Sequence, residues 1–179
     1  TGNIFSAKRI SDFMKSGGSP LNVDTIYNDI KYHEYALVLH KVQRYDVRGK
    51  KILETMEKYY LADQGLLTFL HGYKDTYING ILENIVFIEL LRRGYKVFIG
   101  KIGDMEIDFV AEKNGEKLYV QVAYLISSEE TKERELRPLK SLLALGDNFP
   151  KLILTMDDLP PSNENGIIRK NIREWILEG

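Results

Sequence analysis

The sequence predicts a protein of the α/β (α+β) class with two segments, residues 1–65 and 66–179, that differ in organisation. Three observations predict it. Apolar residues recur at a helical period, three strand-like runs follow one another, and a second helical pattern then leads into an apolar strand. This αβββαβ order, with a helical crossover before its last strand, predicts a mixed sheet flanked by helices.

Residues 1–65 open with two helical patterns. In the first, apolar residues recur at helical spacing over Ile4–Met14, and Gly17 supplies a stop. In the second, Asn22 or Asp24 can cap the helix. The apolar face of this second helix is predicted to hold Ile26, Ile30 and Leu37.

A predicted hairpin completes this segment. One strand pattern covers Ala36–Tyr45, the turn lies at Val47–Lys50, and the second strand runs to Asp63. Helix, helix and basic hairpin is the order of a winged helix-turn-helix. We therefore expect a small winged helix-like domain over residues 1–65.

The second segment carries the αβββαβ pattern. A helix is predicted over Gly80–Arg93, with Gly94 as its stop. Asn114-Gly115 is a strong hairpin turn between the last two of the three strands that follow. Those strands are predicted at Lys96–Ile102, Glu106–Lys113 and Lys117–Tyr124.

The remaining elements of this segment close the pattern. Glu129–Leu145 is helical, and Pro138 predicts a kink or a new helix start within it. An apolar strand is expected at Lys151–Met156. A short strand at Ile167-Ile168 and a helix over Asn171–Glu178 complete the prediction.

Composition narrows the function classes. The net charge of −1 over 179 residues argues against wrapping long nucleic acid through bulk charge, although a local basic patch survives that average. The absence of cysteine excludes disulfides and thiolate metal sites. No apolar run approaches the roughly 18 residues of a membrane span, and no signal peptide opens the chain. We expect a cytoplasmic protein without membrane partners.

The residues that point to chemistry are a helix glutamate, Glu83, and a strand aspartate, Asp108, followed on the next strand by Gln121 and Ala123. Magnesium-dependent nucleases use such carboxylates as hard oxygen ligands and a lysine to assist attack. Gln121 keeps a neutral oxygen but no charge, and Ala123 supplies nothing. We therefore predict four vestigial nuclease positions, with no catalytic residue, no metal and no cofactor in this chain.

Side-chain alternation sets the expected geometry. Glu106, Asp108 and Val110 are predicted to share one face of their strand. The set Tyr119, Gln121 and Ala123 is predicted to share a face of the next strand. Glu83 is equally compatible with a helix-surface carboxylate, and a hydrogen-bonding role in the sheet is favoured for Gln121 over a ligand role. Lys117, roughly 13 Å along the strand from Gln121, is too far to replace the missing lysine.

The combination resembles the PD-(D/E)XK nuclease superfamily. More narrowly, the chain resembles the C-terminal region of prokaryotic AAA-like P-loop ATPases, in which a winged helix and a nuclease-like domain of the DUF4143 family follow the ATPase domain. The matching stretches are Tyr27–Leu39, Lys58–Leu66, Gly80–Asn84, Glu89–Val97, Glu106–Val110 and Val120–Ala123.

The resemblance carries its own expectations. Family members often have Glu-x-Lys where this chain has Gln121-Val122-Ala123, so it implies a degenerate site. The chain contains no phosphate-binding Gly-x-x-x-x-Gly-Lys-Ser/Thr motif. ATP and Mg²⁺ are therefore expected only for the ATPase domain of the intact protein, which the resemblance also implies as a partner.

A basic patch is the second candidate site. Its predicted members, Lys31, Arg44, Arg48, Lys50 and Lys51, belong to the second helix and the hairpin. Such a patch can contact phosphates of DNA, and the alternatives are a solvated hairpin or a protein-docking surface.

Three function hypotheses follow. The first is a non-catalytic accessory module of an ATPase that binds nucleic acid or a partner protein. The second is an active metal-dependent endonuclease with an altered site. The third is a regulatory or oligomerising module, which an exposed apolar patch would favour.

Overall fold

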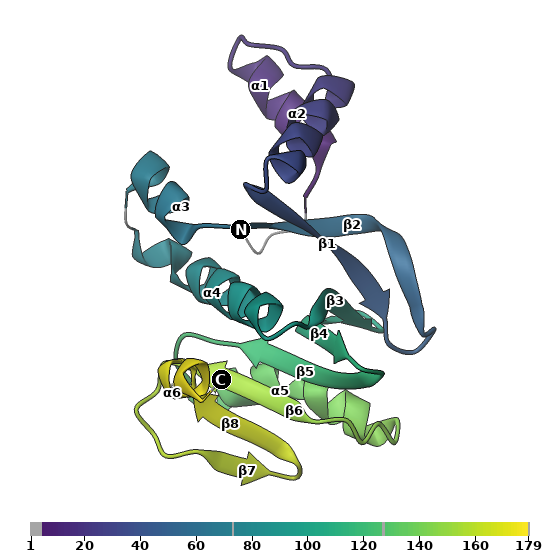
Figure 1. Ribbon diagram of the computed structural model, residues 1–179, viewed down its shortest axis with the longest axis vertical. Helices are drawn as coiled ribbons and strands as arrows, with labels where there is room; N and C mark the ends of the chain where they lie inside the picture. The colour runs from purple at the N-terminus through teal and green to yellow at the C-terminus, as the bar shows by residue number, and fades with distance from the viewer. Residues whose placement is uncertain (1–4, 73, 127, 179) are drawn as a thin grey trace.

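The structure is a computed structural model that describes residues 5–72, 74–126 and 128–178 (Figure 1). It is a mixed α/β protein, which confirms the predicted class. One eight-stranded sheet has the strand order β2-β1-β3-β4-β5-β6-β8-β7. The strands are β1 (Leu39–Asp46), β2 (Lys51–Leu61), β3 (Lys96–Ile102), β4 (Met105–Lys113), β5 (Glu116–Val122), β6 (Lys151–Thr155), β7 (Ser162–Glu164) and β8 (Ile167–Asn171).

Helices lie on both faces of the sheet and beyond its end. They are α1 (Ala7–Ser16), α2 (Val23–Tyr35), α3 (Gln64–His71), α4 (Ile78–Arg92), α5 (Glu129–Ala144) and α6 (Ile172–Leu177), with a short 3-10 helix, η1 (Asp75–Tyr77), before α4. In Figure 1, α6 lies in front of the strands and α5 behind them.

The sheet is mixed and joins the two predicted segments. Strands β3, β4 and β5 are antiparallel, whereas β5, β6 and β8 are parallel. The hairpin predicted as a wing is β1–β2, and β1 pairs in parallel with β3, where Arg44 lies opposite Ile99. The basic hairpin is therefore continuous with the sheet that carries the candidate site.

An apolar core covers each of the two faces of the sheet. On the first face, Phe87 and Leu90 of α4 pack with Trp175 of α6. On the second, Leu139 and Leu142 of α5 pack on the strands. Because the central strands face apolar side chains on both sides, they read as nearly continuous hydrophobic runs in the sequence.

The N-terminal helices pack on each other beyond one end of the sheet (Figure 1). Asn22 caps α2 by accepting a hydrogen bond from the Asp24 backbone N–H at 3.2 Å, which settles the choice of cap. Leu37 was wrongly placed on the apolar face of this helix. It lies beyond the helix end at φ 56° and is exposed. Ile4, predicted in the first helix, lies outside the described residues.

The predicted elements of the second segment are confirmed within a few residues. Pro138 neither ends α5 nor starts a new helix there. Its ring removes one backbone hydrogen bond, and the burial of Pro138 with Leu139 and Leu142 against the sheet offsets that loss. The elements α3 and β7 were not predicted.

Candidate functional site

Glu83 is held at the site by a clamp between α4 and β2. The buried side chain of its neighbour Asn84 accepts a hydrogen bond from the Leu61 N–H at 2.8 Å and donates one to the Leu61 carbonyl at 2.9 Å. This fixes one turn of α4 against the end of β2. The Tyr60 hydroxyl then donates to Glu83 Oε2 at 3.3 Å.

Asp108 is buried in β4 at an irregular point of the sheet. Pairing with β3 shifts register between Phe98 and Gly100, so the chain bulges beside Asp108. A side chain at Gly100 would bring a Cβ within 2.8 Å of Ile107, so this position requires glycine. The bulge accommodates one extra residue of β4 and changes the alternation of its side chains.

The bulge corrects one predicted face. Val110 was expected to share a face with Glu106 and Asp108, but it packs with Ile107 in the core beneath α5. Phe109 packs on the opposite side with α4. Strict alternation fails here because a β-bulge inserts a residue into the strand.

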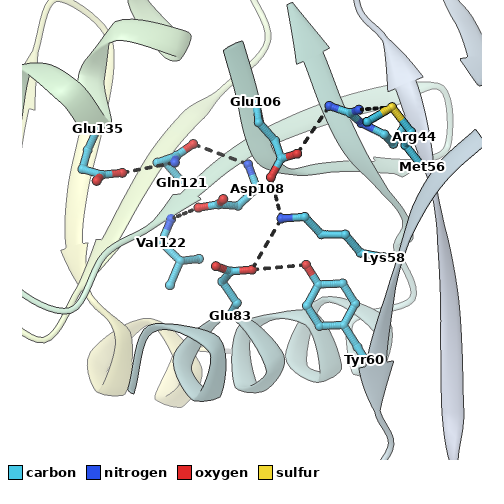
Figure 2. Close-up of polar contacts among 10 residues, drawn as sticks. All are labelled: Arg44, Met56, Lys58, Tyr60, Glu83, Glu106, Asp108, Gln121, Val122 and Glu135. Carbon is cyan, nitrogen blue, oxygen red and sulfur yellow. Dashed lines mark hydrogen bonds and ion pairs between the residues drawn. The ribbon is translucent and has the colours of Figure 1, made fainter. Parts of the chain in front are cut away.

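Gln121 joins Asp108 to α5. The Gln121 Oε1 accepts a hydrogen bond from the Asp108 backbone N–H at 3.4 Å, and its Nε2 donates to Glu135 Oε2 at 3.2 Å. The Asp108 Oδ2 accepts a bond from the Val122 N–H at 2.8 Å. Both side chains are thus occupied by contacts within the protein, as Figure 2 shows.

Lys58 is the site residue that sequence reasoning missed. It comes from β2, is only 4% exposed, and its Nζ lies 2.5 Å from Glu106 Oε1 and 3.9 Å from Glu83 Oε2 (Figure 2). One signal for it was present in the sequence. Lys58 and Tyr60 are two residues apart, so they share a strand face, and Tyr60 is an aromatic residue suited to a core.

Arg44 does not belong to the exposed basic patch. It is 8% exposed, and its Nη2 lies 3.4 Å from Glu106 Oε2. The physical reason is that β1 is an interior strand between β2 and β3, so alternate side chains of β1 are covered. Arg44 therefore supplies a second cation to the carboxylates.

Burial governs the electrostatics of the site. It raises the pKa of Asp108 well above its usual value, the nearby charge of Glu83 raises it further, and the hydrogen bond from Val122 acts in the opposite direction. Burial also raises the pKa of Glu83, which the charge of Lys58 opposes. The Tyr60 hydroxyl has a raised pKa, mainly through burial, and remains a hydrogen-bond donor. The site disfavours an accumulation of negative charge.

All four predicted nuclease positions meet at one cavity of about 520 Å³. Its walls include Glu83, Asp108, Gln121 and Ala123, together with polar side chains of α5 such as Arg134. In the described part of the chain, no group of three or more histidine, aspartate or glutamate residues is arranged to hold a metal ion. The four residues singled out in the sequence therefore line one cavity, where Gln121 and Ala123 contribute no charge.

The predicted basic residues are split between two places. Arg48, Lys50 and Lys51 lie exposed at the turn between β1 and β2, whereas Lys31 lies exposed on α2. The eight residues of β1 separate the two places by roughly 26 Å of strand. Lys31 and the turn do not form one continuous patch.

Lys101 adds a cation near the β1–β2 turn that was not predicted, and acidic residues also lie beside the turn. Lys51 and Lys101 lie on either side of Asp46 in adjacent strands, and Lys101 lies opposite Glu106. The Asp46 Oδ1 also accepts bonds from the backbone N–H groups of Arg48 and Gly49, each at 3.1 Å. The basic turn is therefore partly neutralised by its own supporting residues.

Comparison with known proteins gives relatives but no function. An uncharacterised protein of Haemophilus influenzae is 38% identical over 177 residues, which are 99% of this chain and 43% of that protein. An uncharacterised protein of Methanocaldococcus jannaschii is 30% identical over 162 residues, 87% of this chain and 35% of that protein. No family model and no solved structure matches the chain. The chain thus spans less than half the length of these curated relatives.

Among the described helices, none has the length and apolar character needed to cross a bilayer.

Proposed function

We propose that this chain is a non-catalytic accessory module of a longer P-loop ATPase, with a winged helix-like part over residues 1–65 and a degenerate nuclease-like part over 66–179. One observation carries the non-catalytic assignment. Gln121 and Ala123 line the cavity beside Glu83 and Asp108, at the positions where the resemblance implies a charged ligand and a lysine.

The chemistry of the cavity supports this assignment. Metal-dependent phosphodiester hydrolysis needs charged oxygen ligands and a group that stabilises the attacked phosphate. Here Asp108 has a raised pKa and accepts a bond from Val122, and Gln121 is engaged by Glu135. Ala123 contributes a methyl group to the cavity wall. The framework therefore offers a shaped polar cavity with a weak set of ligands.

The ATPase setting rests on the resemblance and on length. The two relatives contain more than half of their residues outside the matched region, which leaves room for a further domain. In this proposal, ATP and Mg²⁺ belong to that other domain. The uncharged helix α3, whose Phe69 and Leu70 are 87% and 70% exposed, is then a surface against which that domain packs.

The first prediction is that the protein does not cleave plasmid or single-stranded DNA in the presence of Mg²⁺ or Mn²⁺. The reason is the loss of charge at Gln121 and of a lysine at Ala123. Gel analysis after prolonged incubation measures the result. Cleavage that Asp108→Ala abolishes, while the control Asp104→Ala on the exposed β3–β4 turn retains it, would overturn the proposal.

That outcome would favour the second candidate function, an active endonuclease with an altered site. A specific observation supports this alternative. Lys58 places an ammonium group beside Glu83 and Glu106 from a different strand than the one expected to carry a lysine. In such an enzyme, Lys58 rather than residue 123 would face the reacting phosphate.

The proposed nucleic-acid contact is the β1–β2 turn. Weak duplex binding is expected, independent of DNA sequence, with a log–log salt slope near −3 from about three neutralised phosphates. The double charge reversal Arg48→Glu and Lys50→Glu should reduce binding, whereas Lys31→Glu on the distant helix α2 should not. Fluorescence anisotropy on a short duplex across a salt series measures both. Equal affinity of the reversed and native proteins at low salt would assign the module to protein docking.

A further inference from the structure

The candidate site contains a buried cation of its own. Glu83 from α4 and Glu106 from β4 face the ammonium group of Lys58, which reaches them from β2. Arg44 from β1 makes the other described ion pair of Glu106, at 3.4 Å. Two neighbouring strands, β1 and β2, therefore place two cations against carboxylates from α4 and β4.

The ammonium group of Lys58 is more deeply buried than its carboxylate partners. Its side chain is 5% exposed, against 16% for Glu83 and 30% for Glu106. A buried cation loses its hydration and needs carboxylates nearby to offset that loss. Glu83 and Glu106 supply these charges, at 3.9 Å and 2.5 Å from the Lys58 Nζ.

Glu83 is shared between Lys58 and the cavity. The cavity walls include Glu83 and Asp108, whereas Lys58 and Glu106 are not among them. Lys58 thus approaches Glu83 from the β2 side, and solvent approaches it through the cavity. A cation that enters the cavity has to compete with the ammonium group for Glu83.

We propose that Lys58 is the resident cation of this carboxylate group and that it excludes divalent cations from Glu83 and Asp108. The inference rests on the proposed non-catalytic function and deepens it. Metal binding is disfavoured because Gln121 carries no charge and Ala123 replaces a lysine. It is further disfavoured by the positive charge of Lys58 from the β1–β2 hairpin. Removal of that charge should open the cavity to a divalent ion, for which carboxylate oxygens are the preferred ligands.

Calorimetric titration of the full chain with MnCl₂ tests the proposal. Lys58→Met should bind Mn²⁺ at least about tenfold more tightly than the native protein. The substitution removes a positive charge, 3.9 Å from Glu83, that repels an incoming Mn²⁺ ion. Lys41→Met is the matched control, since Lys41 lies on the same hairpin but pairs with Glu57 at the surface. It should leave the affinity unchanged. Adding Asp108→Asn to Lys58→Met should remove the gain and so locate the ion.

A folded Lys58→Met protein with the native Mn²⁺ affinity would overturn the proposal, as would an equal gain in Lys41→Met. Where Lys58→Met alone does not fold, the double variant Lys58→Met and Glu106→Gln removes the ammonium and its nearest partner together. It leaves Glu83 and Asp108 facing the cavity, and it should still bind Mn²⁺ more tightly than the native protein. A folded double variant with no gain would equally reject the resident-cation role.

The outcomes separate this inference from the proposed function. DNA cleavage by the native protein would reject the non-catalytic function without reference to the affinity of any variant. Unchanged Mn²⁺ affinity in the folded Lys58 variants would reject the resident-cation role while the native protein remained inactive.

Discussion

Replacing Lys58 by methionine is expected to lower the free energy of unfolding by about 3 kcal/mol, because it leaves a buried carboxylate without its counter-charge. The methionine side chain is unbranched, one atom shorter, and fills most of the space that the lysine leaves. The loss falls at the low end for buried pairs because Glu106 is 30% exposed and retains Arg44 at 3.4 Å. Glu83, by contrast, loses the cation that opposes the rise in its pKa on burial. Urea denaturation followed by far-UV circular dichroism measures the change.

Two further variants identify the cause of the loss. Lys41→Met removes a lysine that is 40% exposed and pairs with Glu57 at 3.2 Å, so it should cost no more than about 0.5 kcal/mol. Combining Lys58→Met with Glu83→Gln should recover about 1 kcal/mol relative to the single variant, since the carboxylate left without its cation loses its charge. Equal costs for Lys58→Met and Lys41→Met would mean that the buried pair contributes nothing specific.

The local chain pattern was sufficient to predict most of the second segment. The apolar period of α4, the Asn114-Gly115 turn and the apolar run of β6 each depend on neighbours in sequence. Asn114 and Gly115 have φ values of 54° and 82°, the left-handed conformation that such a turn requires. The meeting of Glu83 with Asp108 at one cavity also follows from this order of elements.

The missing parts of the prediction depend on contacts between distant residues. Nothing local to β1 indicates that it pairs in parallel with β3, about 50 residues later, and this pairing buries Arg44. Lysine is usually a surface residue, but the position of β2 in the sheet buries Lys58. The bulge beside Asp108 depends on the close approach of Gly100 to Ile107 in the neighbouring strand. The alternation of residues within one strand cannot predict such a contact.

The largest packing effect is expected for Phe87→Ala, which should lower the free energy of unfolding by about 3–5 kcal/mol. Phe87 projects from α4, is 2% exposed, and stacks on Tyr60 of β2 with ring centroids 4.6 Å apart. Its ring centroid also lies 6.2 Å from that of Phe109 in β4. One side chain therefore connects the helix that carries Glu83 with strands from both segments of the chain.

Truncation at this position leaves a cavity between three elements that cannot close without moving α4. The matched control is Phe69→Ala on α3, where the ring is 87% exposed and the expected change is within about 0.5 kcal/mol. Denaturation should be followed by circular dichroism and by the fluorescence of Trp175, which lies in the same core. Because the Phe87 ring contacts both segments, the two signals should shift together to lower urea. A shift seen by Trp175 alone would show that the β1–β2 hairpin unfolds independently of the sheet core, and a cost below about 1 kcal/mol would contradict the packing role assigned to Phe87.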